Sequence, residues 1–484
     1  MKTRPGARIP FAMKRKRKRA PSTHKVRRDL IGGKRGDGHK RKKPVQRPNP
    51  QRIRTGRPDP SLTACAGLVM FGVFLHLLGV DHELVETFGL IKSVACIYPM
   101  AGQLRMLIDM LVVGEHRVFG LESLAADSLF VRLAGGVVPS LDTVYRDLAR
   151  FDASMIERLE RMMAHHGLAG VRKRLRSAKE VHLDIDTTVN PLFCEVGEIE
   201  GAEVGPNPKY PGRPSYHPVL ARIAETDTCV GALLRPGDTG FGAAEVPLIE
   251  RWIDRVRNVI GSACLMYLRI DSAGDCTEMM LAIIAKGCFF VTRPKLTPDL
   301  LGAIHAHTKW RSVDWDADGR PIRQVATVKF SRGEWQKQGL SVRVVVVRSR
   351  DLDTGRRIYL WEDNDYTVQV FLTNDNYSAE EDVAQRYDKR AGIEPLIAEF
   401  KTAWGIAKVS STNFEANFAL LLLKLLTHNL LRRYVSRHMP KLQSWRALWI
   451  RRAIILVPGR LVRRSGRRLE MRMPPRPILE EMRN

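Results

Sequence analysis

The segment from Tyr387 to Lys401 holds an acid, two cations and a phenol at helical spacing. At about 100° per residue, four side chains project within a stripe roughly 60° wide: Tyr387, Arg390, Glu394 and Lys401. A carboxylate between two cations suits a site that holds a metal ion beside a phosphate group. Arg390 would hold phosphate oxygens in bidentate fashion and Lys401 as a point charge, and Tyr387 could donate its hydroxyl. A solvated row of salt bridges gives the same pattern, so the segment needs partners elsewhere.

Two aspartates upstream could be these partners. Asp186 lies in an alternating, strand-like run, and Asp271 directly follows an apolar run. Two strand-borne aspartates and the helix-borne Glu394 would supply oxygen ligands for two divalent cations about 3.5–4 Å apart. In such a site one metal activates a water or a 3′-hydroxyl and the other stabilises the leaving oxygen.

The surroundings of these acids leave alternatives open. Asp184 would lie on the same strand face as Asp186, and Asp275 or Glu278 could take the place of Asp271. A single aspartate at a strand end is usually a cap or turn residue. The joint occurrence of the acids in one order of elements therefore carries the hypothesis.

The elements that must position these acids can be read from the hydrophobic period of residues 180–292. Strands are expected at 180–192, 219–225, 228–234, 265–270 and 288–292, and helices at 243–259 and 277–286. Three strands, a helix, a strand, a helix and a strand are the element order of a ribonuclease-H-like core. An α/β fold of this class is therefore predicted.

An inserted β subdomain is predicted at residues 308–361. Three strand-like runs lie there, at 324–330, 340–347 and 357–361, and the last two flank the hairpin turn Asp353-Thr-Gly355. The 123 residues from Asp271 to Glu394 exceed what one strand and its connection require. A further strand is expected at 366–372, and Ser378 with Glu381 predicts a capping box at the next helix. Residues 414–431 read as an apolar core helix.

Residues 59–178 look helical throughout. An amphipathic segment at 121–133, the turn Gly135-Gly136 and an N-cap at Ser140 precede a helix at 142–151 with three exposed polar residues: Thr143, Arg146 and Arg150. This order is compatible with a helix-turn-helix reader of DNA, although any helical bundle has such turns. Residues 61–80 are uncharged for twenty residues, but His76, three glycines and the lack of a second span favour a buried helix over a membrane span.

Charge is concentrated at the N-terminus of the chain. Residues 1–60 hold 22 Lys and Arg against three Asp, including an unbroken basic run at 14–19, and the net charge of the chain is +27. Such a segment cannot bury enough apolar area to fold, so a disordered basic arm is predicted. Nucleic acid is the expected partner, with an anionic membrane surface as the alternative. The seven cysteines form no C-x-x-C pair, which indicates neither a zinc site nor a disulfide framework and suits a reducing compartment.

Together these patterns predict six segments. A basic arm (1–58) precedes a helical DNA-binding domain (59–178), and the catalytic core follows in two parts (179–307 and 362–440) around the β subdomain (308–361). A second basic segment ends the chain (441–484), with 12 Lys and Arg against three Glu. It could be a further DNA-contacting edge or a plain surface tail.

The acid motifs resemble those of bacterial DDE-type insertion-sequence transposases of the cut-and-paste group. The third-acid motif of that group is Tyr-x2-Arg-x3-Glu-x6-Lys, which Tyr387, Arg390, Glu394 and Lys401 match at every spacing. Its first motif is an Asp followed by two Thr, here Asp186-Thr187-Thr188, and its second is an Asp before small residues, here within 269–274. The loop at 207–218 also resembles one branch of the group. The resemblance covers about residues 180–440, and the helical region before it less sharply.

The resemblance implies a metal site formed by Asp186, Asp271 and Glu394, and it favours Asp186 over Asp184. Tyr387, Arg390, Lys401 and Thr187 would contact phosphate or DNA. The expected cofactor is Mg²⁺, for which Mn²⁺ can substitute. Trp361 and Tyr366 are candidates for an aromatic contact to an unpaired DNA end. Pro395 departs from a continuous helix, because proline removes a hydrogen bond, so Glu394 could lie where a new helix starts.

The implied activity is that of a DNA transposase that binds the terminal inverted repeats of its element, cuts DNA and joins the freed 3′-hydroxyl to target DNA. A DNA hairpin on the flanking side and a homodimer in the DNA complex are implied as well. We expect a cytoplasmic, nucleoid-associated bacterial protein with no membrane partner. A nuclease or recombinase of the same fold is one alternative. Another is a catalytically inactive or domesticated DNA-binding protein, which the presence of all three acids argues against.

Overall fold

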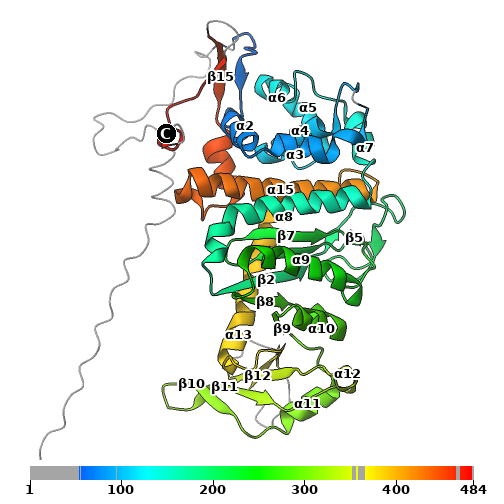
Figure 1. The fold of residues 1–484 in the computed structure, drawn as a ribbon, viewed down its shortest axis with the longest axis vertical. Helices are drawn as coiled ribbons and strands as arrows, with labels where there is room; N and C mark the ends of the chain where they lie inside the picture. The colour runs from blue at the N-terminus through cyan, green and yellow to red at the C-terminus, as the bar shows by residue number, and fades with distance from the viewer. Residues whose placement is uncertain are drawn as a thin grey trace, which may run out of the picture. The chain divides into compact units, whose positions relative to one another are not determined.

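A mixed β-sheet runs through the part of the chain that carries both aspartates (Figure 1). The computed structural model describes residues 54, 56–93, 95–350, 356–357, 366–464 and 469–481. Five strands lie side by side in the order β7-β6-β2-β8-β9: β2 (Glu180–Thr187), β6 (Val219–Ile223), β7 (Thr228–Leu233), β8 (Leu265–Ile270) and β9 (Phe289–Thr292). β6 is antiparallel to both of its neighbours, whereas β2, β8 and β9 run parallel.

Two helices connect these strands in the predicted order. α9 (Val246–Ile260) joins β7 to β8, and α10 (Thr277–Ala285) joins β8 to β9. Trp252 of α9 is fully buried and packs against β7 at Gly231, where an added Cβ would lie 2.1 Å from the indole. The glycine therefore lets the helix approach the sheet closely. The predicted order of three strands, helix, strand, helix and strand is confirmed.

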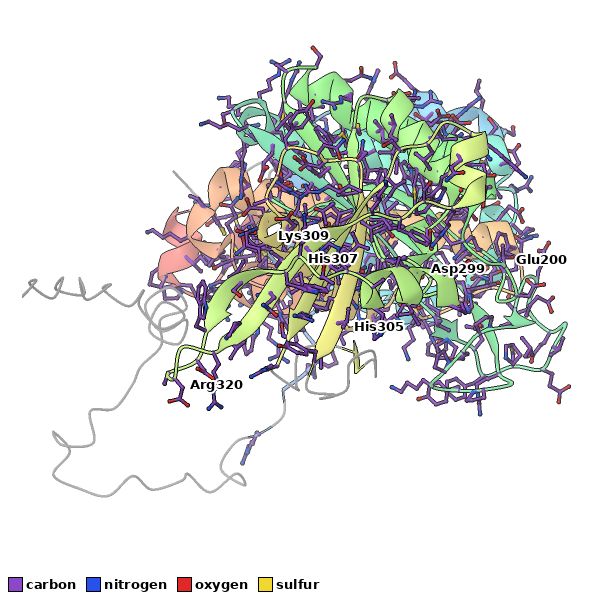
Figure 2. The ribbon with its side chains drawn as sticks, turned by 90° about the horizontal axis from the view of Figure 1, so that it is seen from below. Glu200, Asp299, His305, His307, Lys309 and Arg320 are labelled. Atoms are coloured by element: carbon purple, nitrogen blue, oxygen red, sulfur yellow. The ribbon has the colours of Figure 1, made fainter. Side chains whose placement is uncertain are left out.

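The strands predicted as a separate subdomain extend the same sheet. β14 (Thr367–Thr373) pairs with β9, and the antiparallel strands continue outward from it as β12 (Arg343–Ser349), β11 (Pro321–Val328) and β10 (Arg311–Trp315). The four consecutive valines of β12 lie alternately on the two faces of the sheet, and Val344 and Val346 join the core cluster of the central strands. Figure 2 views this end of the sheet, with His305 at the end of α11 (Pro298–His305), His307 and Lys309 between α11 and β10, and Arg320 at the β10–β11 turn.

A short excursion leaves the sheet between β2 and β6. It forms a three-stranded sheet in the order β3-β5-β4, made of β3 (Asn190–Pro191), β5 (Pro214–Tyr216) and β4 (Glu203–Val204). Most of the loop at 207–218, which resembled one branch of transposases, falls here. The excursion follows Asp186 directly along the chain.

Two long helices pack on the sheet at the β7 side. α8 (Ala153–Arg176) and α15 (Phe414–His438) lie against each other, and both contact β7 (Figure 1). The close approach of the two helices at Gly167 brings Asn429 of α15 within reach of strand β7, where Asn429 Nδ2 donates to the Cys229 carbonyl at 2.9 Å. The apolar helix expected at 414–431 is confirmed and extends seven residues further.

Two local expectations in the helical region have different outcomes. Ser140 caps α7 (Leu141–Leu148) as expected, because its hydroxyl accepts from the Thr143 amide. The segment at 121–133 is not one helix but two, α5 (Leu121–Leu124) and α6 (Ser128–Leu133). Asp127 ends the continuity, since its carboxylate accepts from the amides of Leu129 and Phe130 and caps α6.

The capping box expected from Ser378 and Glu381 is wrong. α13 (Glu380–Asp388) begins after Ala379, which has no side-chain cap. Ser378 donates its hydroxyl to Asp375, and Glu381 pairs with Arg311 instead. Glu381 therefore forms a tertiary salt bridge in place of the local capping contact.

The chain divides into a compact unit, Asp59–Arg472, and a second unit formed by its two ends. The boundaries predicted near 178, 307, 361 and 440 all fall inside the first unit, and the division at those positions stays a prediction. That unit also contains the sheet of β1 (Leu62–Thr63), β15 (Gly459–Arg463) and β16 (Leu469–Arg472). The second unit contains α17 (Pro477–Glu481), and most of the predicted basic arm lies outside the described residues.

In the part of the chain that the structure describes, no single helix is long and apolar enough to cross a membrane. One pair of consecutive helices, Leu68–Leu77 and Val80–Ile91, is together long and apolar enough, but the pair bends by 66°. The predicted helix at 61–80 corresponds to α2 (Leu68–Leu77), whose Phe71, Phe74 and Leu75 are buried.

Candidate active site

Asp186 and Asp271 lie at the same edge of the central sheet. β2 and β8 are parallel neighbours with Ile185 opposite Ile270, so the next residue of each strand is an aspartate. The carboxyl ends of parallel strands are where α/β proteins commonly place their sites. Asp271 Oδ1 accepts from the Ala273 amide at 2.9 Å, and its carbonyl accepts from Thr292 Oγ1 at 2.5 Å, which fixes the backbone there.

The two carboxylates are close enough to affect each other electrostatically. The pKa of Asp186 is raised to about 6, chiefly by burial and in part by the charge of Asp271. Arg390 opposes this shift, because its Nη1 donates to Asp186 Oδ1 at 3.1 Å and its charge is nearby. Both members of this pair are mostly buried, with 12% and 13% of their side chains exposed. The negative charge of the two carboxylates at this edge is therefore only partly compensated by nearby positive charge.

Tyr387 and a second arginine complete this edge. Tyr387 is buried against Phe371 with the ring centroids 5.2 Å apart, and burial raises its pKa. The guanidinium of Arg293 lies 5.0 Å from the Tyr387 ring centroid, and that of Arg390 lies 5.5 Å from it. Sequence reasoning missed Arg293. Its signal was its place directly after β9, the third parallel strand, at the edge where Asp186 and Asp271 follow β2 and β8.

The segment 387–401 is broken into three pieces rather than one helix. Tyr387 lies in α13, Arg390 in the 3₁₀ turn η7 (Lys389–Gly392), and both Glu394 and Lys401 in α14 (Ile393–Ala403). Pro395 sits in the first turn of α14, where a missing amide costs no hydrogen bond. The single-stripe geometry of one continuous helix is therefore wrong, and the restart of the helix at Glu394 is confirmed.

Lys401 reaches the backbone just after the strand that carries Asp186. Its Nζ donates to the Val189 carbonyl at 2.9 Å, three residues after Asp186. Burial lowers the pKa of Lys401, the charge of Lys209 lowers it further, and Asp186 opposes both. Thr187 is the last residue of β2 and lies half-buried beside Asp186.

Glu394 is the exception among the expected site residues. It is exposed on the first turn of α14. Within the described ranges, no group of three or more His, Cys, Asp or Glu side chains is placed to hold a metal ion. The structure thus brings together Asp186, Asp271, Arg390, Tyr387 and Lys401, and it leaves Glu394 outside a ready-made metal cluster.

The alternative acids have structural partners. Asp184 is fully buried between Arg269, whose Nε donates at 2.5 Å, and Arg222, whose Nη2 donates at 3.0 Å. Asp275 pairs with Arg332 at 2.6 Å. Glu278 is exposed at the start of α10. These environments favour Asp186 and Asp271 as the available carboxylates.

A model of the family described as transposase DDE domain group 1 matches residues 51–482. The chain belongs to this family. No curated protein matches it. Among solved structures, the chain matches the piggyBac transposase in a cryo-EM structure of its synaptic complex with hairpin DNA, with 12% identity, a TM-score of 0.40, and 80% of this chain and 79% of that chain covered.

As a transposase-family protein, the chain would be expected to read DNA, and two aromatic candidates can now be placed. Tyr366 is buried, with the Arg348 guanidinium 4.5 Å from its ring centroid, so its face is covered by protein. Trp361 lies outside the described residues. In the predicted helix-turn-helix, α7 ends at Leu148 and Arg150 pairs with Asp147 at 3.2 Å. DNA reading by this helix stays a prediction.

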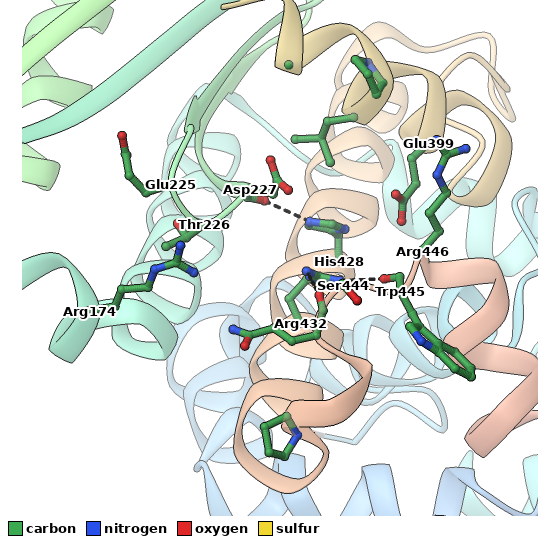
Figure 3. Close-up of a pocket in the computed structure, with 15 residues that line it drawn as sticks. Arg174, Glu225, Thr226, Asp227, Glu399, His428, Arg432, Ser444, Trp445 and Arg446 are labelled. Carbon is green, nitrogen blue, oxygen red and sulfur yellow. Dashed lines mark hydrogen bonds between the residues drawn. The ribbon is translucent and has the colours of Figure 1, made fainter. Parts of the chain in front are cut away.

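A cavity of about 680 Å³ borders the turn that carries Glu394 in this transposase-family chain (Figure 3). Gly392 and Pro395 are among its lining residues. His428 lies at its wall, where its ring bonds the Asp227 carbonyl. His428 is fully buried and its ring packs edge-on against Phe400, with centroids 4.8 Å apart. The first turn of α14 therefore borders open space on the side of this cavity.

Proposed function

We propose that this chain is a DNA transposase with a ribonuclease-H-like core that cuts the ends of its element and joins them to target DNA. The observation that carries the proposal is the placement of Asp186 and Asp271 at the ends of adjacent parallel strands. Arg390 donates a hydrogen bond to the Asp186 carboxylate. Membership of the DDE transposase family supports it. The strand order β7-β6-β2-β8-β9, with its antiparallel and parallel halves, agrees with such a core.

Divalent metal ions serve this family in general, and the residues of this chain fit them. Asp186 and Asp271 are hard oxygen donors, and their mutual repulsion and burial would be relieved by a cation. We propose Mg²⁺, with Mn²⁺ as a substitute, held by Asp186, Asp271 and Glu394. Such ions polarise the scissile phosphate and lower the pKa of the attacking hydroxyl. Glu394 would join the two aspartates by a shift of the first turn of α14.

The cations around the acids have separate tasks in this proposal. Arg390 orients the Asp186 carboxylate through the 3.1 Å hydrogen bond and would release it, or share it, when a phosphate arrives. Lys401 holds the backbone after β2 and presents a charge beside Thr187. Arg293 and Tyr387 would contact phosphate oxygens next to Asp271. These residues bind and orient DNA, and the acids hold the metal.

The partners follow from the same proposal. Double-stranded DNA would be bound at the terminal inverted repeats and at the target, with two copies of the chain in the complex. A hairpin on the flanking DNA belongs to the proposal as well. The protein would act at the nucleoid in the bacterial cytoplasm, and the N-terminal arm would add sequence-blind affinity through its charge.

The test is cleavage of labelled duplex that carries the genomic ends of the element, with Mg²⁺ and with chelator, by wild type and by Glu394→Gln. Glutamine keeps the size and removes the charge, so cleavage should fall below detection while DNA binding is retained. Glu278→Gln, an exposed acid near Asp271, is the matched control and should cleave normally. Unchanged cleavage by Glu394→Gln would exclude Glu394 from the active site.

A second candidate is a catalytically inactive DNA-binding protein of the same fold. The exposure of Glu394 away from a metal cluster favours it. It predicts tight binding to the ends with no Mg²⁺- or Mn²⁺-dependent cleavage by the wild type. The same assay therefore separates the two candidates.

A further inference from the structure

Four basic side chains lie where two turns meet, well away from the acids along the chain. We call them the His116 cluster: His116, Arg117, Lys408 and Lys424. His116 and Arg117 follow α4 (Met100–Val113), Lys408 follows α14, and Lys424 lies in the buried middle of α15. Arg117 and Lys408 are exposed, and His116 is half-buried.

Close packing holds these two turns together. Gly405 ends α14 with a φ of +59°, and a Cβ there would lie 2.5 Å from the Cβ of His116. From below, Lys424 Nζ donates to the carbonyls of Gly405 at 2.7 Å and Lys408 at 2.9 Å. Arg451 donates to the Val112 carbonyl at 3.0 Å and also to the Ala403 carbonyl. The two turns that carry Arg117 and Lys408 are therefore held at fixed positions.

Two members of the His116 cluster, His116 and Lys424, have lowered pKa values because they are buried among positive charges. The pKa of Lys424 is lowered to about 7, chiefly by burial and then by the charges of Arg117 and Lys408. Burial lowers the pKa of His116 to about 4, with contributions from Arg451, Lys424 and Lys408. No carboxylate of the described chain contributes to either shift. His116 Nδ1 is also buried without a hydrogen-bond partner among the described residues.

The cluster continues the line of cations that starts at the acids. Arg390, Lys401 and Lys408 follow one another along and beyond α14. The turn after α14 touches the excursion that follows Asp186, because Asn190 Nδ2 donates to the Ile406 carbonyl at 3.2 Å. At the other end, the charge of Arg117 acts on Tyr145 of α7, the predicted reading helix. The cluster thus lies between the acids and α7.

We propose that the His116 cluster binds phosphates of the DNA duplex between the acidic edge and α7. Arg117 and Lys408 contact backbone phosphates directly, and Lys424 holds the turn that carries Lys408 from below. Exposed cations on fixed turns, with no salt bridge to Arg117 or Lys408 in the described part of the chain, suit a polyanion. Their continuity with Arg390 and Lys401 favours the DNA that enters the acidic edge over an acidic protein. This site rests on the proposed function, since it names a further DNA contact of the same protein.

The test measures how the affinity of the full-length chain for a fluorescein-labelled 40-bp duplex of random sequence depends on salt. Each lost phosphate contact lowers the slope of log affinity against log salt by about 0.9. Arg117→Gln with Lys408→Gln should therefore lower the slope by about 1.8 and weaken binding at least about tenfold at 0.1 M salt. Arg158→Gln with Lys337→Gln removes the same charge from two exposed positions outside the cluster and serves as the matched control.

The outcomes separate this site from the proposed function. A lower slope for the cluster variant than for the control, with near-normal affinity in the conservative single variant Lys408→Arg, supports the site. Equal slopes for cluster and control variants, with DNA still bound, overturn the site and leave the transposase proposal intact. Failure of the wild type to bind duplex DNA overturns both.

Discussion

Two aspartates two residues apart on β2 have opposite environments. Asp184 is fully buried and held by Arg222 and Arg269, whereas Asp186 reaches the sheet edge and meets a single arginine. An alternating strand pattern alone puts both on one face and cannot separate them. The difference lies in the partners, because Arg222 comes from β6 and Arg269 from β8. Burial with two cations indicates structure, and partial burial with incomplete pairing indicates a site.

Asparagine substitutions should separate these roles. Asp184→Asn leaves two buried guanidiniums without a counterion and should lower the free energy of unfolding by about 3–5 kcal/mol. Asp186→Asn removes a charge that burial already disfavours, so stability should stay within about 1 kcal/mol while cleavage is lost. Urea unfolding and the cleavage assay measure the two effects. A stable, inactive Asp184→Asn variant would instead place Asp184 in the site.

His428 predicts a dependence of stability on pH. Burial lowers its pKa to about 3, whereas the unfolded chain has a histidine pKa of about 6.5. The unfolded state therefore binds the proton first, so this contribution to stability is complete above pH 6.5 and is lost as the pH falls toward 3. At pH 5 the loss is about 2 kcal/mol.

His428→Phe should reduce the difference in unfolding free energy between pH 8 and pH 5 by about 2 kcal/mol. Phenylalanine fits beside Phe400 and Trp404 and cannot take up the proton. The variant should lose about 1 kcal/mol at pH 8, because the hydrogen bond to Asp227 is gone. Substitution of the exposed His82 by glutamine is the control. An unchanged pH dependence in His428→Phe would show that other groups cause it.

At the scale of elements, the most local signals were the most reliable. The strand β8 has the predicted bounds, because an apolar run between a glycine-containing turn and an aspartate is unambiguous. Two local expectations failed for different reasons. The segment 121–133 is split by a local signal, because Asp127 caps α6. The capping box at Ser378 fails because Glu381 pairs with the distant Arg311, which local sequence does not reveal. Arg293 was missed because its partner ring, Tyr387, lies 94 residues away.

The turn after α14 gives a prediction for this element. Gly405→Ala imposes both a left-handed φ on alanine and a clash with His116, so it should cost about 2–4 kcal/mol. Gly319→Ala is the matched control, since its φ is +77° and nothing lies within 4 Å of an added Cβ. It should cost about 1 kcal/mol. Equal costs, measured by urea unfolding, would mean that the contact with His116 gives way without strain.

At the scale of the whole molecule, the sequence predicts which strands exist better than it predicts how they join. The runs that were assigned to an inserted subdomain pair edge to edge with β14, so one sheet extends from β7 to β10. Pairing between distant strands depends on backbone hydrogen bonds, which carry no residue signature. The acids at the ends of β2 and β8 could be predicted because their motifs are short. The exposed position of Glu394 depends on the turn η7 and could not be predicted from the motif.

The division of the chain predicts that the N-terminal arm can be removed without unfolding the rest. Deletion of residues 1–56 takes away most of the 22 cations of this region but keeps Asp59, whose carboxylate pairs with Arg460 at 3.1 Å. Since Asp59–Arg472 is a compact unit, the unfolding midpoint should stay within about 2 °C of the full chain. Affinity for random duplex and its salt slope should both fall, because phosphate contacts of the arm are lost.

Cleavage of the element's ends should persist in this truncated chain at saturating protein, because the acids and their cations all lie within the retained unit. Thermal unfolding, fluorescence anisotropy at several salt concentrations and the cleavage assay measure the three effects on one preparation. A lowered midpoint would mean that the arm packs on the unit and stabilises it. Lost cleavage with an intact midpoint and saturated DNA would mean that the arm positions the ends at the acids, which would make it part of the active complex rather than a tether.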